Sequence, residues 1–168
     1  YPSSGSTALS PADRYGLVDD SFSASFSNDS SITRALDMTL ALKDEQYYDV
    51  WYTMVSYLDR VGQLLADKDV YDEYKAFVRS VLQTITAAVG WDEQPSETSD
   101  TKNLRSLILG AAGRYGDLAV LSKSAQLFNE SQDSFEPIPT NLRRVVFENA
   151  LRQSDSVYTA ILDIYQTT

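Results

Sequence analysis

Apolar side chains recur at every third or fourth position along most of this 168-residue chain. That spacing places them on one face of an α-helix, so it predicts a series of amphipathic helices and no convincing strand. Only 5 prolines and 7 glycines interrupt the pattern, which also favours long helices. The periodic segments are residues 11–26, 32–42, 45–66, 70–89, 104–115, 118–128, 142–150 and 157–165. We therefore predict an all-α fold of about eight helices in antiparallel pairs.

Short polar residues and glycines mark the expected helix ends. Ser10-Pro11 predicts the start of the first helix, because serine caps well and proline suits the first helical position. Asp44 is predicted to cap the third helix, and Gly90 to end the fourth as the residue just beyond its last turn. Gly116-Asp117 predicts a tight turn between the fifth and sixth helices. The two longer connections are expected at residues 91–100 and 129–140.

The helix pairs recur at roughly 40 residues, which is the period of HEAT-type repeats. The predicted architecture is therefore an α-α superhelix, a fragment of a HEAT/armadillo-like solenoid. Because no sequence motif repeats with that period, an ordinary helical bundle stays the alternative. The helical-repeat domain is expected over residues 9–168, and residues 1–8 are expected to form a flexible leader.

Acidic side chains dominate the charge of the chain, with 24 Asp and Glu against 14 Lys and Arg and a net charge of −10. A nucleic-acid binder needs a basic surface, so this charge excludes nucleic acid as a partner. No apolar run approaches the ~20 residues of a membrane-spanning helix. The lack of cysteine and of a signal-peptide pattern favours a cytoplasmic protein. The sequons Asn28-Asp29-Ser30 and Asn129-Glu130-Ser131 point instead to a secreted or lumenal protein.

The chain contains neither histidine nor cysteine. The usual zinc sites and the Ser–His–Asp and Cys–His catalytic arrangements depend on these residues, so they are excluded. Carboxylate pairs occur at Asp19-Asp20, Asp44-Glu45 and Asp72-Glu73, but neighbours in a helix diverge by about 100° and do not converge on one ligand. We expect them to be caps and solvated faces. The residues alone thus predict no catalytic and no metal-binding residue, and they indicate an acidic helical scaffold.

Three further groups of residues could serve function or packing. The aromatic side chains of residues 47–57 are predicted mainly to pack in the core, with a stacking platform as the alternative. The scattered arginines are expected to form ion pairs between helices, while a minority could line a groove and hold a substrate carboxylate. The small residues Gly110-Ala111-Ala112-Gly113 predict a close approach of two helices.

Nine short segments, in their order and spacing, resemble the C-terminal helical domain of the gluzincin zinc aminopeptidases, the family of aminopeptidase N and puromycin-sensitive aminopeptidase. The segments are Leu9-Ser10-Pro11-Ala12-Asp13-Arg14, residues 17–22, Ala35-Leu36-Asp37, Tyr48-Asp49-Val50-Trp51, Gly90-Trp91, Leu104-Arg105, Ile138-Pro139, Leu142-Arg143 and Val145-Val146-Phe147. The resemblance extends over residues 9–168. The chain departs from the family pattern at residues 23–28, where relatives often carry an Ala-Gly sequence.

The resemblance implies a non-catalytic domain that closes over the catalytic domain of the same parent chain and encloses the active-site chamber. Zinc and the His-Glu-x-x-His motif belong to that other domain, so this chain alone is expected to be inactive and to need no cofactor. The parent would remove N-terminal amino acids from peptides. In some relatives, basic or tyrosine residues on the third helix hold the C-terminus of the peptide substrate. Arg60 lies near the corresponding place and is the candidate substrate-binding residue.

The family domain normally continues with further helix pairs. The resemblance therefore implies a part of a larger C-terminal domain, and self-association through an uncovered last helix at residues 157–165 is expected. An independent helical-repeat scaffold that binds a protein partner, unconnected with peptidase chemistry, is the alternative function.

Overall fold

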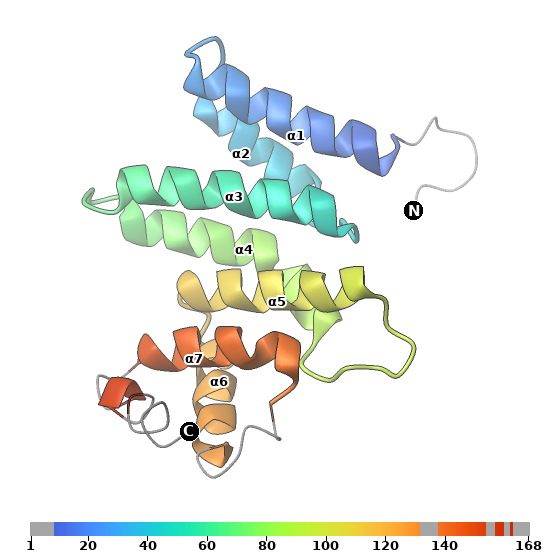
Figure 1. Ribbon diagram of the computed structural model, residues 1–168. Helices are drawn as coiled ribbons and strands as arrows, with labels where there is room; N and C mark the ends of the chain where they lie inside the picture. Colours follow the sequence, from blue (N-terminus) through green and yellow to red (C-terminus); the bar gives the residue numbers. More distant parts are fainter. Residues whose placement is uncertain (1–8, 132–137, 154–156, 160–161, 163–168) are drawn as a thin grey trace. The chain divides into compact units, whose positions relative to one another are not determined.

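The computed structural model describes residues 9–131, 138–153, 157–159 and 162 (Figure 1). Over these residues the chain is all helical and has no strand, which confirms the predicted all-α class. The chain divides into two compact units, Tyr1–Tyr71 and Asp72–Thr168, and each is described by itself. The helices are α1 (Pro11–Phe26), α2 (Ile32–Ala41), α3 (Tyr48–Leu65), α4 (Tyr71–Val89), α5 (Ser99–Arg114), α6 (Leu118–Glu130), the 3-10 helix η1 (Thr140–Leu142) and α7 (Arg143–Leu151).

The first unit is built on α1, which packs against both α2 and α3. Ser10 caps α1 as predicted: its hydroxyl oxygen accepts the backbone N–H of Asp13 at 3.2 Å, and the Asp13 carboxylate accepts the Ser10 backbone N–H at 2.9 Å. This reciprocal capping box satisfies two of the N–H groups that a helix start leaves open. Val18 and Phe22 on α1 are completely buried.

The start of α3 differs from the prediction. Asp44 does not cap it; the helix begins at Tyr48, and Tyr47 is its first flanking residue, without a side-chain cap. The neighbouring Glu45 explains the difference, because its carboxylate accepts the backbone N–H groups of Gln46 at 2.7 Å and Tyr47 at 3.0 Å. These bonds hold the chain extended before the helix. Glu45 is buried, and it pairs with Arg14 of α1, so the expectation of a solvated face is wrong there.

In the second unit, α5 packs against α6, η1 and α7, and α6 packs against α7. Gly113 of α5 sits against Asn149 of α7, and an added Cβ would lie 2.1 Å from the Asn149 side-chain oxygen. Asn149 donates from its amide nitrogen to the Leu109 carbonyl at 3.4 Å and to the Ser124 hydroxyl at 3.2 Å. The close helix approach predicted for residues 110–113 is therefore confirmed.

Two glycines end helices as predicted. Gly90 has a φ of 55° directly after α4, and Gly116 has a φ of 81° between α5 and α6. These left-handed conformations cost a side-chain-bearing residue energy, so glycine is the residue that suits both turns. The start of α5 at Ser99, with Thr98 as its cap, lies five residues before Leu104, where the predicted fifth helix begins. The connection after α4 covers residues 90–98, close to the predicted 91–100.

Several predictions fall on residues that the structure does not describe. The leader at residues 1–8 lies outside the described residues, and so do residues 132–137 of the second long connection. Of the predicted last helix, residues 157–159 and 162 are described and helical. Self-association through this helix stays a prediction. The described helices are consistent with helix pairs, and their arrangement as a superhelix also stays a prediction.

Candidate functional site

Arg60 lies in the last turns of α3, and its side chain is exposed. The central carbon of its guanidinium group is 3.9 Å from the centre of the Phe26 ring, which comes from the end of α1. Within the part of the chain that the structure describes, no hydrogen bond or ion pair engages this guanidinium. A cation that rests on a ring face uses its own flat face for the contact and keeps its N–H groups at the edges. Arg60 is therefore oriented and still able to donate.

The ring below Arg60 belongs to an aromatic stack that is anchored in the core. Phe26 lies 6.5 Å from Phe22 and 6.1 Å from Tyr57, measured between ring centres. Phe22 and Tyr57 are nearly parallel, with ring centres 4.7 Å apart and an angle of 3°. The spacing explains this arrangement: Phe22 and Phe26 are four residues apart on α1, and Tyr57 and Arg60 are three apart on α3, so each pair shares a helix face.

A polar contact ties α1 to α3 beside the stack. The Tyr57 hydroxyl donates to the Asp19 carboxylate at 2.7 Å and lies 3.3 Å from the Ser23 hydroxyl. The bond with Ser23 favours the ionised phenol, but the bond to Asp19, burial and the negative charge of Asp19 together raise the pKa of Tyr57 above its ordinary value. The phenol stays protonated at neutral pH. It serves as a donor that positions α3, and it is no general base.

The aromatic residues on the first turns of α3 divide between core and surface. Trp51 is completely buried, and its ring N–H donates to the Glu45 carbonyl at 2.9 Å. Tyr52 is 54% exposed, and its ring centre is 5.9 Å from that of Tyr48. Tyr47, before the helix, is also exposed. Trp51 therefore packs in the core, while Tyr47 and Tyr52 lie on the surface.

Two other arginines form ion pairs inside the fold, but their partners Glu45 and Glu97 lie in connections and not on neighbouring helices, where the sequence predicted them. Arg105 of α5 is 2% exposed; it donates to the Val89 carbonyl at 2.9 Å and to the Glu97 carboxylate at 2.7 Å. Arg14 of α1 pairs with Glu45. These guanidinium groups hold segments of their own unit together.

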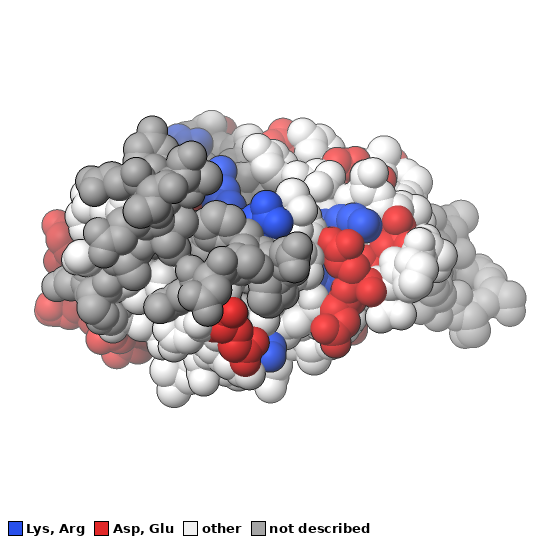
Figure 2. Space-filling model, turned by 60° about the horizontal axis from the view of Figure 1, so that its bottom comes forward, with Lys and Arg blue, Asp and Glu red and all other residues white. Residues whose placement is uncertain are grey.

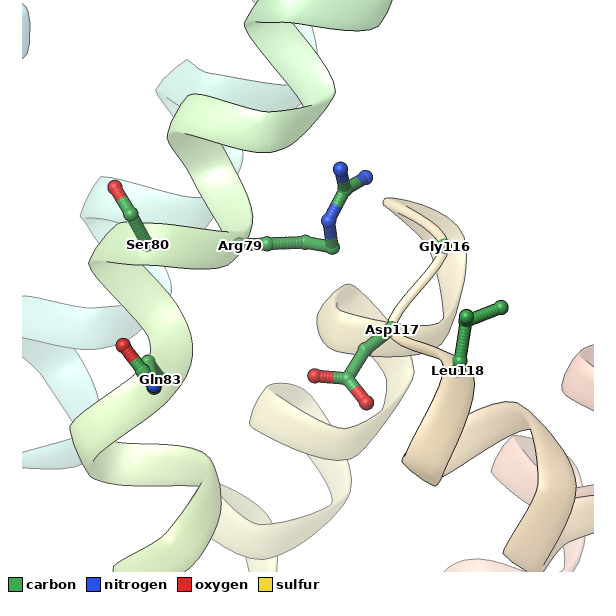
Figure 3. Close-up of a pocket in the computed structure, with 6 residues that line it drawn as sticks. All are labelled: Arg79, Ser80, Gln83, Gly116, Asp117 and Leu118. Carbon is green, nitrogen blue, oxygen red and sulfur yellow. The ribbon is translucent and has the colours of Figure 1, made fainter.

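A hollow of about 600 Å³ lies in the second unit, between α4 and the turn that joins α5 to α6. Its charged side chains both serve helix ends. Arg79 donates to the Tyr115 carbonyl at 2.6 Å at the end of α5, and the Asp117 carboxylate accepts the Val120 backbone N–H at 3.0 Å at the start of α6. Figure 3 shows Arg79 extending toward the turn at Gly116 and the Asp117 carboxylate pointing back toward α4. Arg79 and Asp117 are already engaged in hydrogen bonds that hold helix ends. Arg60 is therefore the stronger candidate for binding a ligand.

The described residues contain no group of three or more His, Cys, Asp or Glu side chains that could hold a metal ion. None of the described helices is long and apolar enough to cross a membrane. Figure 2 shows acidic side chains gathered in several patches on one face, with fewer basic ones among them.

The sequence pointed to Arg60 but missed the residues that position it. Phe26 belongs to the apolar stripe of the first helix, and Tyr57 belongs to the aromatic segment of the third. Their contact depends on how α1 crosses α3. The signal that could have found them is the matching spacing of aromatic residues on two consecutive long helices.

Comparison with known proteins identifies the family. The model of the ERAP1-like C-terminal domain matches residues 2–168. Glutamyl aminopeptidase of Bos taurus is 29% identical over 96% of this chain, which covers 17% of that protein. Aminopeptidase M1 of Arabidopsis thaliana is 28% identical over 97% of the chain, and mitochondrial aminopeptidase 2 of Saccharomyces cerevisiae is 26% identical over 92%.

The chain spans a fifth or less of the length of these relatives, at 17%, 20% and 17% respectively. Each relative is a longer chain that bears the name of an aminopeptidase, and the match extends over nearly the whole of the present sequence. This confirms the resemblance found in the sequence: the chain belongs to the family of ERAP1-like C-terminal domains, which are the C-terminal domains of zinc aminopeptidases.

Proposed function

We propose that this chain is the part of a zinc aminopeptidase that encloses the active-site chamber and helps to bind the peptide substrate. The family match and the aminopeptidase names of the relatives support this proposal. The catalytic domain of the same parent chain would be its partner, and zinc would be bound there. The parent enzyme would remove N-terminal amino acids from peptides, while residues 9–168 would act as a helical-repeat domain without catalytic residues of its own.

Arg60 carries the binding part of the proposal. Its guanidinium rests on Phe26 and keeps its N–H edges free of any partner among the described residues. A carboxylate accepts two parallel hydrogen bonds from such an edge, which makes this pair one of the strong charge-assisted contacts in proteins. Every unmodified peptide ends in a carboxylate. Arg60 would therefore hold the C-terminus of a peptide whose N-terminus reaches the catalytic domain.

A distant carboxylate site adds binding energy only for substrates that are long enough to reach it. Short aminoacyl dyes would be cleaved without help from Arg60. Long peptides would depend on it, and they would lose that dependence when the C-terminal carboxylate is replaced by an amide. This difference separates a substrate-binding role from a structural one.

The test is Arg60→Ala in the full parent enzyme, with kcat/KM measured for an aminoacyl dye and for peptides of increasing length. Loss of a charge-assisted bond corresponds to about 1.5–3 kcal/mol, so long peptides should be cleaved at least tenfold less efficiently. Cleavage of the dye should stay unchanged. Arg34→Ala, which removes an exposed arginine of α2 in the same unit, is the matched control and should leave both substrates unaffected. An equal loss for dye and peptides would overturn the proposal.

A further inference from the structure

The outer face of α3 carries more than Arg60. Asp49, Tyr52, Ser56 and Arg60 are all exposed, and they follow one another at intervals of three or four residues. That spacing keeps side chains on one face of a helix. The stripe has a cationic end at Arg60 and an aromatic end at Tyr52, more than two helical turns away.

Tyr52 is the open part of this aromatic region. Its side chain is 54% exposed, and it leans against the half-buried Tyr48 with ring centres 5.9 Å apart and an angle of 39°. The pair therefore offers an apolar surface with hydroxyl groups at its rim. Tyrosine rings of this kind bind apolar and aromatic side chains well, because they bury a large area at little entropic cost.

The distance between the two ends of the stripe fits a short stretch of peptide. Eight residues separate Tyr52 from Arg60, which is about 12 Å along the helix axis at 1.5 Å per residue. An extended peptide advances about 3.3 Å per residue. A chain whose carboxylate meets Arg60 therefore passes Tyr52 about four residues before its C-terminus.

We propose that Tyr52, supported by Tyr48, forms a second subsite that binds an apolar or aromatic side chain about four residues before the C-terminus of the peptide. This inference rests on the proposed function of Arg60, since the spacing is counted from the carboxylate. The ligand is then a peptide that is bound at two points. Arg60 binds its C-terminal carboxylate, and Tyr52 contacts a side chain upstream. The exposed Asp49, one turn beyond Tyr52, disfavours acidic side chains at the upstream end.

The experiment measures binding of ten-residue peptides to the 168-residue chain by fluorescence polarisation. Each peptide consists of glycine and serine with a single phenylalanine, which is moved from the last position to the seventh from the end, and each is made as the free acid and as the amide. Affinity of the free acids should peak when phenylalanine stands three to five residues before the last, by about fivefold. Tyr52→Ser should abolish the peak, and Tyr52→Phe should keep it.

Tyr15→Ser is the matched control, because Tyr15 is an exposed tyrosine on α1 of the same unit, and this variant should keep the peak. A flat profile with the free acids still preferred over the amides would overturn the second subsite and leave the role of Arg60 intact. The same holds if Tyr52→Ser weakens every peptide equally. Equal affinity of acids and amides would overturn the role of Arg60, and with it the reference point for the subsite.

Discussion

Two arginines in the two units show how the same side chain can be structural or available. Arg105 is 2% exposed, and it donates to the Val89 carbonyl and pairs with the Glu97 carboxylate through both terminal nitrogens. Arg60 is exposed, and its contact is the face of the Phe26 ring. The difference lies in how many N–H groups the fold itself satisfies. Arg105 uses its donors to hold its unit together, whereas the donors of Arg60 have no partner among the described residues, as the proposed binding role requires.

The electrostatics of Arg105 follow from its partners. The hydrogen bonds that Arg105 donates to the Glu97 carboxylate outweigh the effect of burial and raise the pKa of Arg105 above its ordinary value. Hydrogen bonds from Arg105 outweigh burial at the carboxylate and lower the pKa of Glu97 below its ordinary value of 4.5. The pair thus joins α5 to the connection that follows α4, and the bond to Val89 adds the last carbonyl of α4.

The largest expected effect is the loss of stability in Arg105→Ala. Removing the buried Arg105 side chain leaves the Val89 carbonyl and the half-buried Glu97 carboxylate without their donor, which costs about 1–3 kcal/mol. Arg60→Ala should cost less than about 1 kcal/mol, because it removes only an exposed contact with a ring. Urea unfolding followed by circular dichroism measures both. Equal losses in the two variants would contradict the distinction between the two arginines.

The sequence predicted what is local and missed what depends on the crossing of helices. The cap at Ser10, the glycine turns at Gly90 and Gly116 and most helix bounds follow from spacing and end residues, and these predictions are confirmed. The predicted start of α3 was wrong. The Glu45 carboxylate accepts the backbone N–H groups of Gln46 and Tyr47, which keeps this segment extended, and Asp44 does not cap the helix. The burial of Glu45 depends on Arg14, 31 residues away, and a local pattern has no access to that contact.

Of the candidate site, too, the residue Arg60 was predictable, and its contacts with other helices were not. The resemblance directed attention to Arg60, and the aromatic segment before it was recognised as notable. Neither could indicate that Phe26 lies under the guanidinium, since this contact requires α1 and α3 to cross at a particular level. The exposure of Tyr52 has the same origin. When a helix carries aromatic residues on several faces, the positions of the neighbouring helices decide which of these residues are buried and which are exposed.

A smaller effect should appear on acidification. Because the folded chain holds the pKa of Glu97 below its ordinary value, the ionised carboxylate stabilises the fold above pH 4.5, and this contribution is lost as the pH falls through the lower folded pKa. The free energy of unfolding is measured in urea from pH 7 down to pH 3. The difference in this free energy between the unchanged chain and Glu97→Gln should narrow as the pH falls. Glu73→Gln removes the same charge from an exposed position in α4 and serves as the control. A difference that stays constant with pH would show that the pair contributes no charge-dependent stability.

The smallest expected effect is the coupling between Arg60 and Phe26. A double-mutant cycle with Arg60→Met, Phe26→Leu and the double variant isolates the contact from the packing that each change also disturbs. The coupling free energy should be about 0.5–1 kcal/mol, the value of an exposed cation–ring contact. A coupling near zero would mean that the ring does not position the guanidinium. When a peptide free acid is bound, the coupling should persist, because the carboxylate meets the edge of the guanidinium and the ring meets its face. If the coupling instead vanished on binding, the guanidinium would have to leave Phe26 to reach its ligand. The contact with Phe26 would then exist only in the unbound chain and would not orient Arg60 for the carboxylate.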